Sequence, residues 1–131
     1  MGQPAAKQGD QVLATDTHII MIPSPGGPVP TPLPHPFTGQ IDGALSSDVN
    51  IEGKPAAVQG STATNMPSHI PQGGPFQKPP SNRATIQLGR SSVFIEGNPA
   101  ARHGDTAMTC NDPADLPVGT VVAVGTVMIG G

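Results

Sequence analysis

The chain has 131 residues, of which glycine and proline contribute 17 each, and it carries 6 lysines and arginines against 9 aspartates and glutamates. This length suits one small domain over residues 1–131, and the net charge of −3, without tryptophan or tyrosine, argues against nucleic-acid binding. Only 11% of the residues are charged, so charge repulsion does not hold the chain in a disordered state despite its glycine and proline content.

Residues 1–6 lack the apolar stretch of a secretory signal. No later segment approaches the roughly 18 to 20 apolar residues that a membrane-spanning helix needs. The sequence therefore predicts synthesis in the cytoplasm and no stable membrane insertion, unless a secretion machine exports the protein.

A seven-residue unit occurs three times and organises the chain. Its copies are PAAKQGD at residues 4–10, PAAVQGS at 55–61 and PAARHGD at 99–105. The second and third copies follow similar segments, 46–54 and 91–98, so the repeat units begin near residues 4, 46 and 91. One such unit cannot bury its apolar face alone, whereas three can close around a common axis.

Short β-branched and apolar runs at 49–51, 92–95 and 120–124 predict strands between turns. Glycine and proline interrupt every window long enough for a helix. The sequence therefore predicts a small all-β fold with approximate threefold internal symmetry.

Two proline-rich segments, 23–36 and 71–80, separate the units. One interpretation is a pair of polyproline-like surface loops that serve as docking sites. We favour rigid loops that keep their shape without a core beneath them, because proline has little backbone freedom to lose.

The core is predicted to be thin, since Phe37, Phe76 and Phe94 are the only aromatic residues. A single cysteine, Cys110, excludes an intramolecular disulfide. A metal ion or a tight oligomeric contact remains as the additional source of stability.

His18 and His69 each lie 14 residues after the first proline of their unit, so the repeat places them at equivalent positions. His35 stands between two prolines, and Cys110 lies three residues before Pro113, which takes the same phase in the third unit. Three imidazoles and one thiolate suit a tetrahedral zinc site, with iron as the alternative metal. Scattered surface histidines and one buried cysteine are the alternative interpretation.

A closed site of four protein ligands is structural, because catalysis needs an open position. His103 is left out, because its position carries glutamine in the other two units, although His103 or water stays the alternative to Cys110 as fourth ligand. A Cys–His nucleophile, paired carboxylates and a phosphate-binding loop find no support in the pattern, so the sequence predicts no enzyme and no small-molecule substrate.

The thrice-repeated Pro-Ala-Ala unit, with its preceding Val-x-Ile strand, resembles the PAAR-repeat family over essentially the whole chain. The resemblance implies a small cone-shaped fold that binds zinc near its apex through histidines and a cysteine, here His18, His35, His69 and Cys110. The first two units depart from the family pattern at Lys7, Val58 and Ser61.

The resemblance further implies a structural tip that caps the trimeric β-helical spike of a contractile injection system, one tip per trimer, and aids puncture of the target envelope. Such a protein moves from the cytoplasm to the apex of the particle and enters the target on firing. Its proline-rich loops and lack of terminal extensions resemble tips of phage-tail-like extracellular particles more than cargo-carrying tips of type VI secretion systems. The alternative is a metal-stabilised adaptor that docks an effector or binds a target surface.

Overall fold

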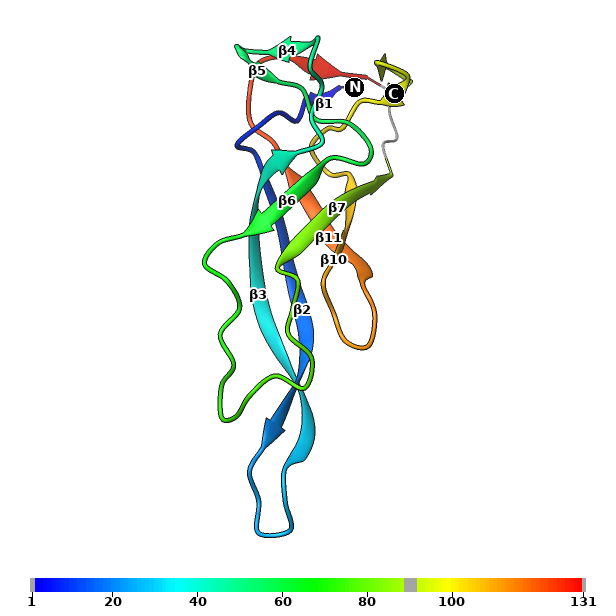
Figure 1. Ribbon diagram of the computed structural model, residues 1–131. Coiled ribbons are helices and arrows are strands. Elements are labelled where there is room, and N and C mark those ends of the chain that lie inside the picture. Colours follow the sequence, from blue (N-terminus) through cyan, green and yellow to red (C-terminus); the bar gives the residue numbers. More distant parts are fainter. Residues whose placement is uncertain (1, 89–91, 131) are drawn as a thin grey trace.

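The computed structural model describes residues 2–88 and 92–130, and this part of the chain is an all-β fold without helix, which confirms the predicted fold class. A six-stranded barrel, closed in the order β10–β11–β2–β3–β6–β7, forms the middle of the molecule (Figure 1). Its strands are β2 (Gln11–Ile22), β3 (Val29–Gly43), β6 (Thr62–Asn65), β7 (Arg83–Leu88), β10 (Thr106–Thr109) and β11 (Leu116–Val122). No helix among the described residues is long and apolar enough to cross a membrane.

Three two-stranded sheets lie together at one end of the barrel, near both chain termini (Figure 1). They pair β4 (Asn50–Ile51) with β5 (Lys54–Pro55), β8 (Phe94–Ile95) with β9 (Asn98–Pro99), and β1 (Gln3–Pro4) with β12 (Met128–Ile129). We call this end the base. The long β2–β3 hairpin extends from the opposite end (Figure 1).

The three Pro-Ala-Ala units meet in a ring of hydrogen bonds between base and barrel. The amide of Ala57 donates to the carbonyl of Ala6, that of Ala101 to Ala57, and that of Ala6 to Ala101. Each of these hydrogen bonds is 3.0 Å long. The side chains of these three alanines are fully buried. The repeat units therefore close around a common axis, and a methyl group is the side chain that fills the space where the three backbones meet.

The β1–β12 sheet completes the first unit with residues from the far end of the sequence. Val127 O accepts a hydrogen bond of 2.8 Å from Ala5 N, as Val49 and Val93 do from the corresponding alanines of their units. One isoleucine of each small sheet is buried beneath the base: Ile51, Ile95 and Ile129. The Val-Met-Ile segment at 127–129 is thus the third copy of the Val-x-Ile strand, which the sequence analysis missed because this unit is split between the two ends.

The first proline-rich segment differs from its prediction, because it is largely strand and not loop. β3 begins at Val29 and pairs with β2 without interruption from Ile22↔Val29 to Gln11↔Gln40. On its other side β3 pairs with β6 only from Gly39 to Gly43, so the proline-rich part is an open edge. Proline is tolerated there, because an edge position that faces away from the neighbouring strand needs no N–H.

The second proline-rich segment is a loop, as predicted, and it runs along β2. Gln77 N donates to Ile19 O and Met21 N donates to Pro75 O, both over 2.9 Å. Between them Phe76 forms an isolated bridge with Ile20. The loop therefore covers the outer edge of β2, on the side of the hairpin away from β3.

Candidate metal centre

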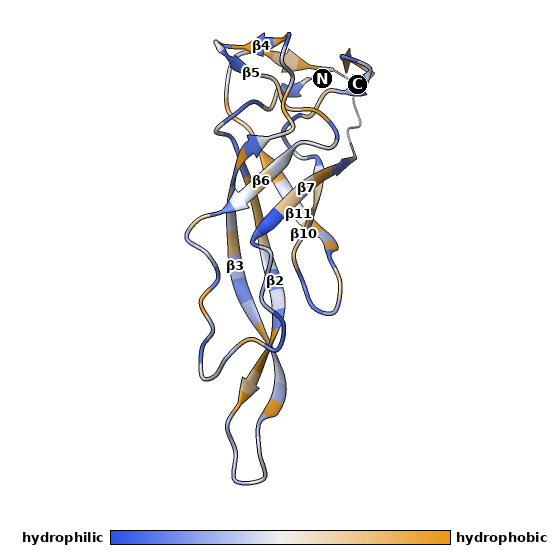
Figure 2. Cartoon of the chain, viewed as in Figure 1, coloured by the Kyte–Doolittle hydropathy of each residue, from blue (hydrophilic) through white to orange (hydrophobic). Residues whose placement is uncertain are grey.

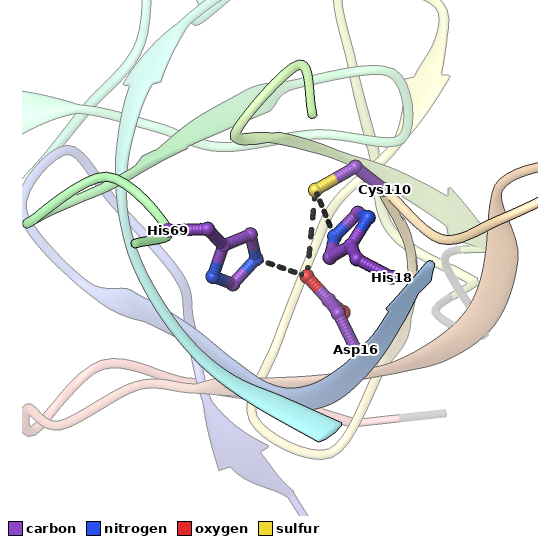
Figure 3. A group of neighbouring side chains, drawn as sticks. All are labelled: Asp16, His18, His69 and Cys110. Atoms are coloured by element: carbon purple, nitrogen blue, oxygen red, sulfur yellow. Dashed lines mark hydrogen bonds and ion pairs between the residues drawn. The ribbon is translucent and has the colours of Figure 1, made fainter. Parts of the chain in front are cut away.

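Four buried side chains with metal-binding atoms converge where the hairpin leaves the barrel (Figure 3). Asp16 and His18 come from β2, His69 from the loop after β6, and Cys110 from the residue after β10. One ligand atom from each lies within 4.8 Å of all the others. In a tetrahedral zinc site the ligand atoms are roughly 3.3 to 3.7 Å apart, so small side-chain movements would bring the four into range.

Asp16 is the member of this group that the sequence analysis missed. Its side chain is fully buried and accepts hydrogen bonds from Thr109 Oγ1 at 2.5 Å, His69 Nε2 at 2.9 Å and Cys110 Sγ at 3.4 Å. Residues two apart on a strand share a face, so Asp16 and His18 both point into the site. That spacing was the available signal, but it required β2 to continue through both residues.

His35 lies directly opposite Asp16 in the β2–β3 pairing and is also buried. Its ring centroid is 5.4 Å from those of His18 and His69, so its ring packs against both, but His35 does not belong to the group of four whose ligand atoms lie within 4.8 Å of one another. Its Nδ1 donates to Leu33 O at a distance of 2.9 Å, and in a neutral ring with this tautomer Nε2 is the acceptor. Ligating histidines commonly have their second nitrogen held in this way.

All four residues named from the sequence, His18, His35, His69 and Cys110, thus lie in one buried cluster. His35 falls in the segment 23–36 that was predicted to be a loop, but it lies, like His18, on a paired strand. A hairpin positions them more rigidly than turns would, since its backbone hydrogen bonds fix both strands.

The environment of His18 favours a neutral imidazole. Burial lowers the pKa of His18 below its usual value, with a further lowering from the neighbouring His69. Its Nε2 lies 3.6 Å from Cys110 Sγ. Its buried Nδ1 is 3.6 Å from the Asp112 carboxylate and has no hydrogen-bond partner among the described residues. Nε2 is therefore the nitrogen that faces the other ligand atoms of the group, whereas Nδ1 faces Asp112.

The Cys110 thiol stays protonated at neutral pH without a metal. Burial, followed by the charge of Asp16, raises its pKa to about 11. A bound cation would favour the thiolate and reverse this shift. Imidazole nitrogen, thiolate sulfur and carboxylate oxygen are ligands of zinc, so the chemistry of the cluster fits a zinc ion.

Two surface hollows adjoin the cluster. A pocket of about 230 Å³ has His35 and His69 in its wall, together with Met66, Pro67 and Ile70. A smaller one of about 80 Å³ reaches His18 and Cys110 from another side. The two pockets thus reach the cluster from two different sides.

His103 lies apart from the described cluster. It belongs to the third Pro-Ala-Ala unit, and its Nδ1 accepts a hydrogen bond of 3.2 Å from Ala123 N. The Nδ1 atom of His103 is thus occupied by a hydrogen bond from the backbone just after β11.

Comparison with known proteins identifies one family. A family model described as PAAR motif matches residues 21–114, which is well over half of the chain. This range includes His35, His69 and Cys110 and two of the three repeat units. A search of the curated proteins finds no match.

Proposed function

Since the chain belongs to the PAAR-motif family, which is associated with the spike of contractile injection systems, we propose that it is the structural tip that caps and sharpens a trimeric spike. The observation that carries this proposal is the threefold closure of a single chain through the ring of Ala6, Ala57 and Ala101. A chain with pseudo-threefold symmetry can present three similar surfaces to three identical spike subunits. One tip would then serve one trimer.

The base is the surface suited to this contact. An exposed valine stands directly before one strand of each sheet, namely Val49, Val93 and Val127, and two of the sheets add the exposed Phe94 and Met128. Short, open strand edges and apolar side chains at one end of a small domain favour association with a matching β-structure. Burial of this patch would stabilise the complex and prevent the base from associating with copies of itself.

The metal centre has a structural role in this proposal. We assign the ligands to His18, His35, His69 and Cys110, with zinc as the metal and iron as the alternative. Asp16 accepts hydrogen bonds from two members of the cluster, and its negative charge, added to that of a Cys110 thiolate, would balance a divalent cation in a buried site. The ion would tie both hairpin strands to the His69 loop and to the end of β10, where the core contains few large side chains.

We propose no catalytic activity, because four protein ligands leave no open position for a substrate. In this account the protein rides at the apex of the particle and reaches the target envelope on firing. Its work there is mechanical.

Stoichiometry tests the proposal most directly. When the chain is mixed with the trimeric spike protein of its own system, native mass spectrometry should detect one tip per three spike chains. Phe94→Asp should abolish the complex, because it places a charge in the base contact, whereas Val118→Asp on the exposed side of β11 should not. A complex with three tips per trimer, or one that tolerates Phe94→Asp but not Val118→Asp, would contradict capping by the base.

A further inference from the structure

The distal part of the β2–β3 hairpin carries no formal charge. Between Asp16 and Asp42 the sequence has no aspartate, glutamate, lysine or arginine, and its two histidines belong to the metal centre. Beyond that centre Val29 is exposed, and Ile19, Met21, Ile22 and Leu33 are partly exposed. Figure 2 shows this apolar colouring at the end of β2 that projects farthest from the barrel.

In the distal part of β2, from Thr17 to Met21, the N–H groups along the outer edge are all engaged. Thr17 N donates to Asn111 Oδ1 over 2.6 Å, and Ile19 N donates to Asp112 Oδ2 over 2.9 Å. Met21 N donates to Pro75 O over 2.9 Å. Because these three residues donate away from β3, the hydrogen-bonded pairs of the hairpin are made by the residues between them.

The outer edge of β3 has no N–H groups to engage. The residues opposite Thr17, Ile19 and Met21 in the pairing are Pro34, Pro32 and Pro30. These prolines occupy the positions that face away from β2, and proline has no amide hydrogen. Along the paired strands, residues 17–22 and 29–34, therefore, neither edge of the hairpin leaves a backbone donor unpaired.

This combination points to a lipid surface as the partner. In water an exposed N–H is satisfied by solvent, and a protein that adds a strand to a sheet edge needs such donors. A bilayer imposes the opposite requirement, since unpaired backbone donors and formal charges are both costly in its apolar region. Entry into a bilayer also needs exposed apolar side chains, and these lie at the same end of the molecule.

We propose that the distal end of this hairpin, residues 19–33, is a lipid-contacting wedge that enters the outer part of a bilayer ahead of the rest of the tip. This inference rests on the proposed tip function and names the part of the molecule that meets the membrane first. Entry is shallow. Residues 19–22 span only about 13 Å at the usual strand rise, and the prolines keep outward carbonyls that need water or lipid headgroups nearby.

A single tryptophan reports this contact, because the natural chain has none. Val29→Trp places the probe at the wedge, and Val118→Trp places a matched probe at a similarly exposed valine of β11. With phosphatidylcholine vesicles, the emission of the Val29→Trp protein should shift to shorter wavelength and be quenched by lipids brominated in their acyl chains. The Val118→Trp protein should show neither effect.

A charge placed in the wedge provides the second arm of the test. Adding Met21→Lys to the Val29→Trp protein should abolish the quenching. Both proteins must keep the metal content and thermal unfolding profile of the natural chain, and Thr31→Trp replaces Val29→Trp if that variant does not. Absence of quenching in a folded protein, equal quenching of both probes, or quenching only with anionic lipids would overturn the wedge, because the hairpin has no charge for an anionic surface to attract. Retained binding to the spike in the same preparations would show that the tip function stands independently.

Discussion

The thiol of Cys110 donates a 3.4 Å hydrogen bond to the carboxylate of Asp16, and both side chains are buried. In the metal-free protein burial, the charge of Asp16 and, to a smaller extent, this bond raise the pKa of Cys110 and keep the sulfur protonated. A zinc ion would replace the thiol proton, so that the cation lies between two negative charges where only one existed before. Without the metal, Asp16 thus helps to keep the Cys110 thiol protonated. With the metal, the Asp16 carboxylate and the Cys110 thiolate together would balance the charge of the cation.

Asp16→Asn tests the carboxylate. The substitution keeps the shape of the side chain but removes its charge, so zinc affinity should fall about 10- to 100-fold, as is typical for residues that support metal ligands. Competition with a chromophoric chelator measures the change. Asp42→Asn, at an exposed position after Ile41, is the matched control and should leave the affinity unchanged. An unaltered affinity for Asp16→Asn would show that the carboxylate has no part in the site.

The metal-free protein should lose stability as the pH rises from about 9 to about 11. The folded protein holds the Cys110 proton up to a pKa of about 11, whereas the unfolded chain releases it near the usual cysteine value. The folded state therefore binds more protons in this window, and the free energy of unfolding falls with pH, by at most about 1.4 kcal/mol per pH unit. Urea denaturation at several pH values should give this slope for the natural chain and remove it from Cys110→Ser. An equal slope in both proteins would assign the effect to other groups.

Metal removal should destabilise the protein strongly, since a structural zinc ion contributes roughly 10 kcal/mol and small domains have only about 5 to 15 kcal/mol of stability. Dialysis against a chelator should lower the melting temperature, and added zinc should restore it. His35→Ala should reduce both metal content and melting temperature, whereas His103→Ala should leave one metal ion per chain. If the His35→Ala protein kept one metal ion per chain and the Asp16→Ala protein lost it, the fourth ligand would be Asp16 and not His35.

The sequence predicted the fold class because its repeats and turn residues act locally, so the copies at 4–10, 55–61 and 99–105 could be recognised without knowing the packing. It did not predict β3, because alternating prolines indicate a loop unless a neighbouring strand is known to pair on one side only. For the cluster, repeat phase singled out His18 and His69, although one lies in a strand and the other in a loop. Asp16 was missed because a single aspartate has no pattern until the strand that carries it is known.

The second unit offers a test of how the repeats tolerate their departures from the family pattern. In the first unit Lys7 Nζ lies 3.3 Å from Asp10 Oδ2 and donates to Val124 O over 2.5 Å. The second unit has Val58 and Ser61 at these positions, and the Ser61 hydroxyl donates over 2.9 Å to Ala44 O. The serine thus supplies a donor to a neighbouring carbonyl, as the lysine does in the first unit.

Ser61→Asp alone should therefore be destabilising, because it buries a charge without a cation and removes the donor to Ala44 O. Val58→Lys alone should also destabilise, since it places an ammonium at a buried valine position. Together they recreate the first unit's pair, so the double variant should be more stable than the two single losses predict, by roughly 0.5 to 3 kcal/mol in the free energy of unfolding. Urea denaturation of the four proteins measures this coupling, and Lys7→Val with Asp10→Ser provides the reciprocal cycle in the first unit. Additive losses in both cycles would mean that the buried pair contributes nothing beyond its separate members.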